Sequence, residues 1–126
     1  MTELRVLISD DDVMIRDVLK EVLDDEPDIA VVAVAGDADE AIRLAERHRP
    51  AVAVLDVRMP GGGGARAARE IARCSPETAI LAFSAYADRA SIAGLEAAGV
   101  TEYLVKGVPN RVIVEAVRRL GGQRPD

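Results

Sequence analysis

Four polar features each end a short apolar run in this chain of 126 residues, and together they could carry out phosphate chemistry. Asp56 follows the apolar residues 51–55, and the other three features are the triplet Asp10-Asp11-Asp12, Ser84 and Lys106. Carboxylate oxygens bind Mg²⁺ together with waters and phosphate oxygens. A Lys is a point-charge partner for a phosphoryl group, and an Asp can attack phosphorus to give an aspartyl phosphate. These residue types indicate a divalent metal and phosphoryl chemistry around Asp56.

Each feature taken alone also has an ordinary structural explanation. The three acids could cap the helix that follows them, because negative charge suits a helix N-terminus. Asp56 could start a turn, and Ser84 and Lys106 could be structural or solvated. Their combination favours a functional site, because all four stand at equivalent strand ends and adjacent carboxylates call for a cation. We expect Asp12, the third acid, to be the helix cap.

The elements that must position these residues alternate between strand and helix. Apolar runs predict five strands, at residues 4–8, 29–35, 51–55, 78–83 and 101–105. Helical spacing predicts five helices: 12 to about 25, one ending near His48, one after the glycines at 61–64, one capped by Asp88, and one opening near Asn110. The chain therefore predicts an α/β fold with a doubly wound parallel sheet, for which right-handed crossovers leave two common strand orders. For five strands we choose the flavodoxin-like (βα)5 architecture with the order 2-1-3-4-5. This order brings all four features to one edge of the sheet.

Composition narrows the setting in which the chain works. The length suits a single domain, expected over residues 1–120, with 121–126 as a tail or the start of a linker. The formal net charge of −6 disfavours direct nucleic-acid binding by this domain. A lone cysteine, Cys74, excludes an internal disulfide and fits a reducing compartment. The sequence has neither a signal peptide nor an apolar stretch of membrane-spanning length, so we expect a cytoplasmic protein without a membrane partner.

The ordered motifs resemble the receiver domain of two-component response regulators. They are VLISDD at residues 6–11, DVRMPG at 56–61 with Gly64, AFSA at 82–85, and AGVTEYLVK at 98–106. The resemblance runs from about Leu4 to Leu120. It implies a bacterial phosphoacceptor signalling module that takes a phosphoryl group from a sensor histidine kinase or phosphotransfer protein. The module would then switch conformation to control an output domain or a partner.

The resemblance also implies a role for each matching residue. Asp56 would accept the phosphoryl group, and Mg²⁺ would be held by Asp10, Asp11, Asp56 and the backbone carbonyl of Arg58. As the family's residues do, these would promote the domain's own phosphorylation and dephosphorylation without making it an enzyme.

Further matching positions concern the phosphorylated state. The resemblance implies that Ser84 and Lys106 bind the phosphoryl group and that Tyr103 is the aromatic switch. Arg58 and Tyr86 occupy the two positions that flank the path of the hydrolytic water, and they would tune the lifetime of the phosphorylated state. A homodimer through the fourth helix, fifth strand and fifth helix is a further expectation.

This chain departs from the family pattern in two loops. Gly62 and Gly63 replace bulkier or acidic residues, so we expect an unusually mobile loop after Asp56. Gly107 follows Lys106 where Pro is usual. A cis bond is common there in the family, but without Pro it costs about 2.5–4 kcal/mol, so we expect a trans bond.

Two other functions compete with the switch. A stand-alone receiver could act as a phosphorelay or binding module without an attached output domain. An aspartyl-phosphate phosphatase is less well supported, because that class has a second Asp two residues after the nucleophile and Arg58 occupies that position.

Overall fold

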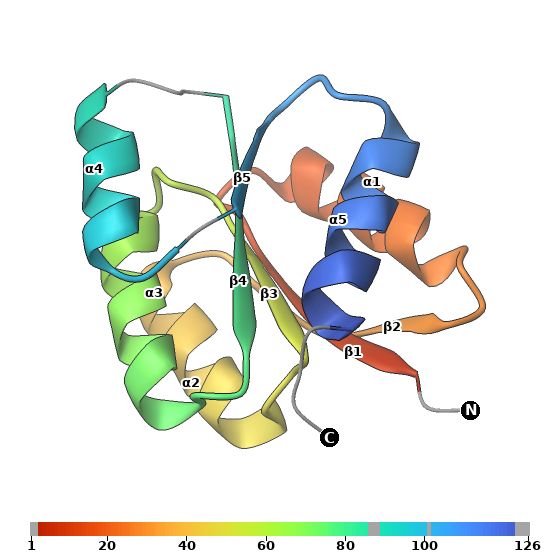
Figure 1. The fold of residues 1–126 in the computed structure, drawn as a ribbon, viewed down its shortest axis with the longest axis horizontal. Coiled ribbons are helices and arrows are strands. Elements are labelled where there is room, and N and C mark those ends of the chain that lie inside the picture. Colours follow the sequence, from red (N-terminus) through yellow and green to blue (C-terminus); the bar gives the residue numbers. More distant parts are fainter. Residues whose placement is uncertain (1–2, 86–88, 101, 123–126) are drawn as a thin grey trace.

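A five-stranded parallel sheet forms the centre of the molecule, with helices on both faces (Figure 1). A computed structural model describes residues 3–85, 89–100 and 102–122. The elements are β1 (Leu4–Ser9), α1 (Val13–Asp24), β2 (Ile29–Ala35), α2 (Ala38–His48), β3 (Val52–Leu55), α3 (Gly63–Cys74), β4 (Ala79–Ser84), α4 (Arg89–Ala97), β5 (Glu102–Val105) and α5 (Asn110–Gly122). The strand order β2-β1-β3-β4-β5 confirms the predicted topology.

The strand registers align the carboxyl ends of the four strands that precede the polar features. Ser9 pairs with Leu55, and Ser84 pairs with Val105. The ladder continues just beyond the strands, because the Asp56 amide donates to the Ser9 carbonyl at 2.9 Å and the Lys106 amide donates to Ser84 at 2.8 Å. The residues that follow these strands are therefore fixed by backbone hydrogen bonds at one edge of the sheet.

Two apolar layers hold the helices on the sheet. Figure 1 shows α1 and α5 on one face of the sheet and α2, α3 and α4 on the other. One apolar layer lies under each of these two groups of helices. Side chains along β1 point alternately to the two faces of the sheet and so contribute to both layers. Val6 and Ile8 face α1 and α5, while Leu7 faces the opposite side. α4 is the most thinly attached helix, because Leu95 is its one fully buried side chain.

Element boundaries follow the sequence expectations with small shifts. α1 begins at Val13, and β3 and β4 begin one residue later than predicted. The expected cap of α4, Asp88, lies outside the described residues. α5 continues through Gly122, although the sequence placed a tail from residue 121. Gly121 is buried against Leu4, where a Cβ would lie 2.7 Å from a Leu4 methyl carbon, so this last turn packs on the sheet. The division between domain and tail stays a prediction.

The outer face of α1 carries apolar side chains that the helical pattern did not distinguish from core residues. Leu19 and Leu23 are buried, whereas Val13, Met14 and Val18 are exposed. Spacing alone therefore predicted the helix but not which of its apolar residues reach the sheet. Within the residues that the structure describes, no helix has both the length and the apolar character needed to cross a bilayer.

Candidate functional site

The carboxyl edge of the sheet brings the predicted polar features together. Asp10 follows β1, Asp56 follows β3, Ser84 is the last residue of β4, and Lys106 follows β5. Asp10, Asp56 and Ser84 are all buried. A cluster of buried polar groups at the end of a parallel sheet is where open α/β folds place their ligands.

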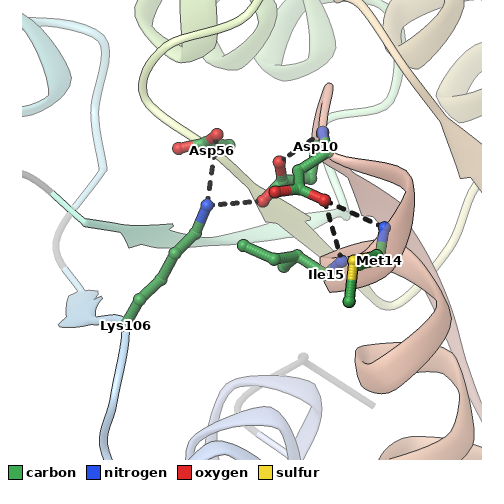
Figure 2. A network of polar contacts seen from close by, with 6 residues as sticks. Asp10, Met14, Ile15, Asp56 and Lys106 are labelled. Atoms are coloured by element: carbon green, nitrogen blue, oxygen red, sulfur yellow. Dashed lines mark hydrogen bonds and ion pairs between the residues drawn. The ribbon is translucent and has the colours of Figure 1, made fainter.

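Lys106 joins the two buried carboxylates. Its Nζ lies 2.7 Å from Asp10 Oδ2 and 3.3 Å from Asp56 Oδ2, and its side chain is 17% exposed. Figure 2 shows the extended Lys106 side chain reaching both acids. A hydrogen-bonded cation compensates much of the cost of holding two like charges close together in a site with little water.

Asp12 acts as the N-cap of α1, which confirms the predicted cap. Its carboxylate accepts hydrogen bonds from the amides of Met14 at 2.9 Å and Ile15 at 3.4 Å. The Asp12 amide in turn donates to Asp10 Oδ1 at 2.9 Å. The cap residue of α1 therefore also orients the Asp10 carboxylate, a link that the sequence analysis did not foresee.

The pKa of Asp56 is raised above the ordinary Asp value. Burial is the largest cause, and the negative charge of Asp10 acts in the same direction. Lys106 and a hydrogen bond from the Arg58 backbone amide oppose the shift without cancelling it. A carboxylate in this state gains from any further cation that approaches it.

The pKa of Lys106 is also raised. Burial is the largest single influence and would lower it, but the hydrogen bond to Asp10 and the charges of Asp56 and Asp10 together outweigh burial. Lys106 therefore stays charged at neutral pH, ready to pair with an anion at this edge.

Three carboxylates could hold a metal ion here. One oxygen each from Asp10, Asp11 and Asp56 lie within 4.8 Å of one another. Asp11 is exposed while the other two are buried, so the group opens to solvent on one side. An all-oxygen donor set with a solvent-facing side fits Mg²⁺, which keeps several waters when it binds to proteins.

The remaining predicted residues are spread around this cluster. Tyr103 on β5 is exposed, and it lines a narrow cleft together with Ser84 and Leu95. Arg58 is exposed, and its backbone amide is the group that bonds to Asp56. Tyr86 lies outside the described residues.

The loop after Asp56 contains three consecutive glycines in the left-handed region. Gly61, Gly62 and Gly63 have φ values of 90°, 107° and 75°, which L side chains rarely adopt. Gly64 is required by close approach, because a Cβ there would lie 2.5 Å from the Asp56 carbonyl oxygen. Arg66 contacts this loop, and sequence reasoning had given it no role.

The second unusual loop behaves as expected. No peptide bond in the described parts of the chain is cis, so the Lys106–Gly107 bond is trans. Gly107 instead adopts a φ of 107° with open space around it. The turn after Lys106 is therefore made by a left-handed glycine.

Comparison with known proteins identifies the family. The family model described as response regulator receiver domain matches residues 6–118. This chain belongs to that family. Receiver domains bind Mg²⁺ through acidic residues, and Asp10, Asp11 and Asp56 form a group of this kind. The membership confirms the predicted phosphoacceptor signalling module of two-component systems.

Relatives of this receiver domain are bacterial response regulators. It is 41% identical over 104 residues to the transcriptional regulatory protein PdtaR of Mycobacterium tuberculosis, covering 81% of this chain and 49% of that protein. It is 31% identical over 121 residues to the transcriptional activator DevR/DosR of the same organism, covering 96% of this chain and 56% of the relative. The chain thus spans about half the length of these relatives.

Solved structures give the same assignment. The receiver domain of the putative response regulator NarL from Mycobacterium tuberculosis has a TM-score of 0.92 and 31% identity, with 98% of this chain and 100% of that one covered. The response regulator domain of Thermotoga maritima CheB has a TM-score of 0.87 and 26% identity, with 98% and 99% covered. The receiver fold therefore extends over nearly the whole chain.

Proposed function

We propose that Asp56 is the phosphoacceptor of this receiver domain and that Lys106 and Mg²⁺ provide the positive charge for the transfer. The observation that carries this proposal is the position of Lys106 Nζ, within hydrogen-bonding distance of two buried carboxylates at the edge of the sheet. The phosphodonor would be a phosphohistidine on a sensor kinase or phosphotransfer protein.

Mg²⁺ would be held by Asp10, Asp11, Asp56 and the backbone carbonyl of Arg58. The three carboxylates support the site because their oxygens converge. Burial and, after it, the charge of Asp10 raise the pKa of Asp56, so its carboxylate would gain from a bound cation. When bound, Mg²⁺ would neutralise charge on the phosphoryl oxygens during transfer.

The transfer is a substitution at phosphorus. A carboxylate oxygen of Asp56 forms the new O–P bond while the N–P bond of the phosphohistidine breaks, and the imidazole leaves with that electron pair. The Arg58 amide orients the attacking carboxylate through its hydrogen bond. Lys106, already paired with Asp56, would move to a phosphoryl oxygen as the negative charge shifts onto it.

The response to phosphorylation would begin at Ser84 and Tyr103. Ser84 would donate its hydroxyl hydrogen to a phosphoryl oxygen, and Tyr103 would move inward when Ser84 shifts. The narrow cleft that both residues line supports this coupling. The rearranged α4, β5 and α5 would then present a changed surface to an output domain, a partner or a second copy of the chain.

Two arrangements of the output remain as alternatives within this proposal. Relatives named as DNA-binding or transcriptional regulators are about twice as long as this chain, which favours control of an attached output domain. A stand-alone receiver that relays the phosphoryl group would use the same site. The length of the complete gene product distinguishes the two.

The central test is labelling by a small phosphodonor. Acetyl phosphate with Mg²⁺ should add one phosphoryl group to the wild type, measured as intact mass, and EDTA should prevent the addition. Asp56→Asn should remain unlabelled, since it lacks the nucleophilic oxygen. A fully labelled Asp56→Asn protein would reject the assignment.

A Mg²⁺ titration followed by amide NMR tests the metal site separately. Shifts should concentrate around Asp10, Asp11, Asp56 and Arg58. They should be lost in Asp11→Asn and kept in Asp17→Asn, a matched change on the exposed face of α1. Shifts confined to other regions would place the metal elsewhere.

A further inference from the structure

Three left-handed glycines make the loop after Asp56 a segment with unusual conformational freedom. We call residues 57–63 the glycine loop. A glycine populates positive and negative φ with similar ease, so three in succession cost more conformational entropy to order than other residues do. The loop carries the Arg58 amide that bonds to Asp56. Its order is therefore a condition for the geometry of the site.

Hydrogen bonds hold the glycine loop at four of its carbonyl groups. Val57 and Met59 accept from the amides of Gly64 and Gly63, both within the turn into α3. The other two connect the loop to its surroundings. Pro60 accepts from the Ala38 amide at 2.9 Å, and Gly61 accepts from Arg66 Nη1 at 2.6 Å. Of these four donors, Arg66 alone is a side chain.

Arg66 fastens the glycine loop to two helices. The same Nη1 atom that bonds to Gly61 lies 2.7 Å from Asp39 Oδ1 in the first turn of α2. The aliphatic part of Arg66 lies against Gly62, where a Cβ would be 2.7 Å from Arg66 Cδ. The glycine at position 62 therefore makes room for the side chain that crosses it.

We propose that Arg66 is a positioning residue for phosphoryl transfer to Asp56. By holding the Gly61 carbonyl and the Asp39 carboxylate, it orders the glycine loop and with it the Arg58 backbone. This inference rests on the proposed function of Asp56. It also changes the expectation of a mobile loop, since the freedom given by Gly62 and Gly63 is offset by one arginine.

Whether replacing Arg66 tightens or weakens Mg²⁺ binding distinguishes a positioning role from a purely electrostatic one. Removing a cation near a metal site should tighten Mg²⁺ binding if Arg66 acts only through its charge. Loss of loop order should instead weaken binding, because the Arg58 carbonyl is then no longer held in place. The side chains of Arg66 and Asp39 are 39% and 68% exposed, so the contact is modest and a change of about threefold is expected.

The experiment compares Arg66→Met with Arg66→Lys and Arg73→Met. Arg73 lies on the same helix and makes a 2.7 Å ion pair with Glu70, so its replacement removes the same charge without touching the loop. One nitrogen, Arg66 Nη1, makes both contacts, so the single ammonium group of a lysine should be able to make them as well. Mg²⁺ affinity is measured by amide NMR, the acetyl phosphate labelling rate by intact mass, and stability by thermal unfolding.

Arg66→Met should bind Mg²⁺ about threefold more weakly and should be labelled more slowly, at an unfolding temperature close to that of Arg73→Met. Arg66→Lys should behave as the wild type does. Should Arg66→Met be unfolded, Asp39→Asn weakens the same ion pair from the other side. Its control is Glu70→Gln, which removes the same charge from the pair with Arg73, and Asp39→Asn should bind Mg²⁺ more weakly than Glu70→Gln does.

Two results would overturn the inference. Mg²⁺ affinity and labelling equal to those of Arg73→Met, or tighter Mg²⁺ binding, would show that Arg66 has no positioning role while leaving the function of Asp56 intact. A wild type that acetyl phosphate cannot label would instead overturn the proposed function, and this inference with it.

Discussion

Lys106 lies closer to Asp10 than to Asp56, with Nζ–Oδ2 distances of 2.7 Å and 3.3 Å. The lysine thus occupies the region between two carboxylates that are also candidate metal ligands. A protein cation and a metal cation then compete for the same negative charge. This competition leads to the first prediction.

Lys106→Met should bind Mg²⁺ more tightly than the wild type, by roughly tenfold or about 1.4 kcal/mol. The variant removes the ammonium that neutralises Asp10 and Asp56 and leaves their charge for the metal. Titration followed by amide NMR measures the affinity. Lys20→Met is the control, because Lys20 is the only other lysine and pairs with Asp24 on the exposed side of α1. Weaker binding in Lys106→Met would contradict the prediction.

Asp56→Asn should be more stable than the wild type at about pH 7 in EDTA, and this advantage should disappear below about pH 3.5. The pKa of Asp56 is raised in the folded protein, so its ionisation costs stability as the pH rises from the ordinary Asp range through the raised value. Asn has no such ionisation.

Urea unfolding at the two pH values measures the difference. Adding Mg²⁺ at neutral pH should narrow it, because the metal stabilises the charged wild type. A wild type that is the more stable protein at neutral pH without metal would show that Lys106 compensates the buried charge completely.

Asp12→Ala should destabilise the protein by about 1 kcal/mol, because it removes the side-chain cap of α1. Asp12→Ser should retain most of that stability, since a serine hydroxyl also accepts from the first-turn amides. Chemical denaturation measures both. A larger loss of Mg²⁺ affinity in Asp12→Ser than in Asp11→Asn would assign Asp12 to the metal site instead.

The double variant Arg58→Asn, Tyr86→Glu should lose its phosphoryl group about tenfold faster than the wild type, or about 1.4 kcal/mol in barrier. Hydrolysis is faster when a hydrogen-bonding side chain orients the attacking water, ideally one that can accept its proton. The side chain of Arg58 has no acceptor atom, and a tyrosine ring obstructs access without acting as a base. The measurement follows intact mass after the donor is removed. Equal rates would show that water access is controlled elsewhere, with the glycine loop the next region to test.

The parallel sheet and the edge where the site lies could be predicted from two features of the sequence. These are the spacing of apolar residues within each element and the alternation of strands with helices along the chain. A run such as residues 51–55 has no polar residue, so it predicts a strand buried on both faces, and β3 is buried throughout. Once the strands alternate with helices, Asp10 and Asp56 must meet at one edge. The cap at Asp12 followed from equally local chemistry, because an acid directly before a helix satisfies its first amides.

Other features could not be predicted because they depend on distances between side chains, which the spacing of residues in the sequence does not give. The resemblance placed Lys106 at the phosphoryl group that Asp56 would carry, but the reach of a flexible side chain brings it nearer Asp10. Helical spacing could not separate the exposed Met14 from the buried Leu19, because the width of the buried stripe depends on how α1 sits against α5. Arg66 was missed because its partners, Asp39 and Gly61, belong to another helix and to a backbone carbonyl.

The single buried side chain of α4 has a consequence for how this family diversifies. Substitutions in a packed core cost about 2–5 kcal/mol when a large side chain is truncated, whereas exposed positions tolerate change at little cost. The exposed residues of α4, Arg89, Ala90, Ala93, Glu96 and Ala97, belong to the tolerant kind. Its outer surface can therefore accumulate substitutions while the phosphorylation site stays unaltered, so related regulators can evolve different recognition without rebuilding their interiors.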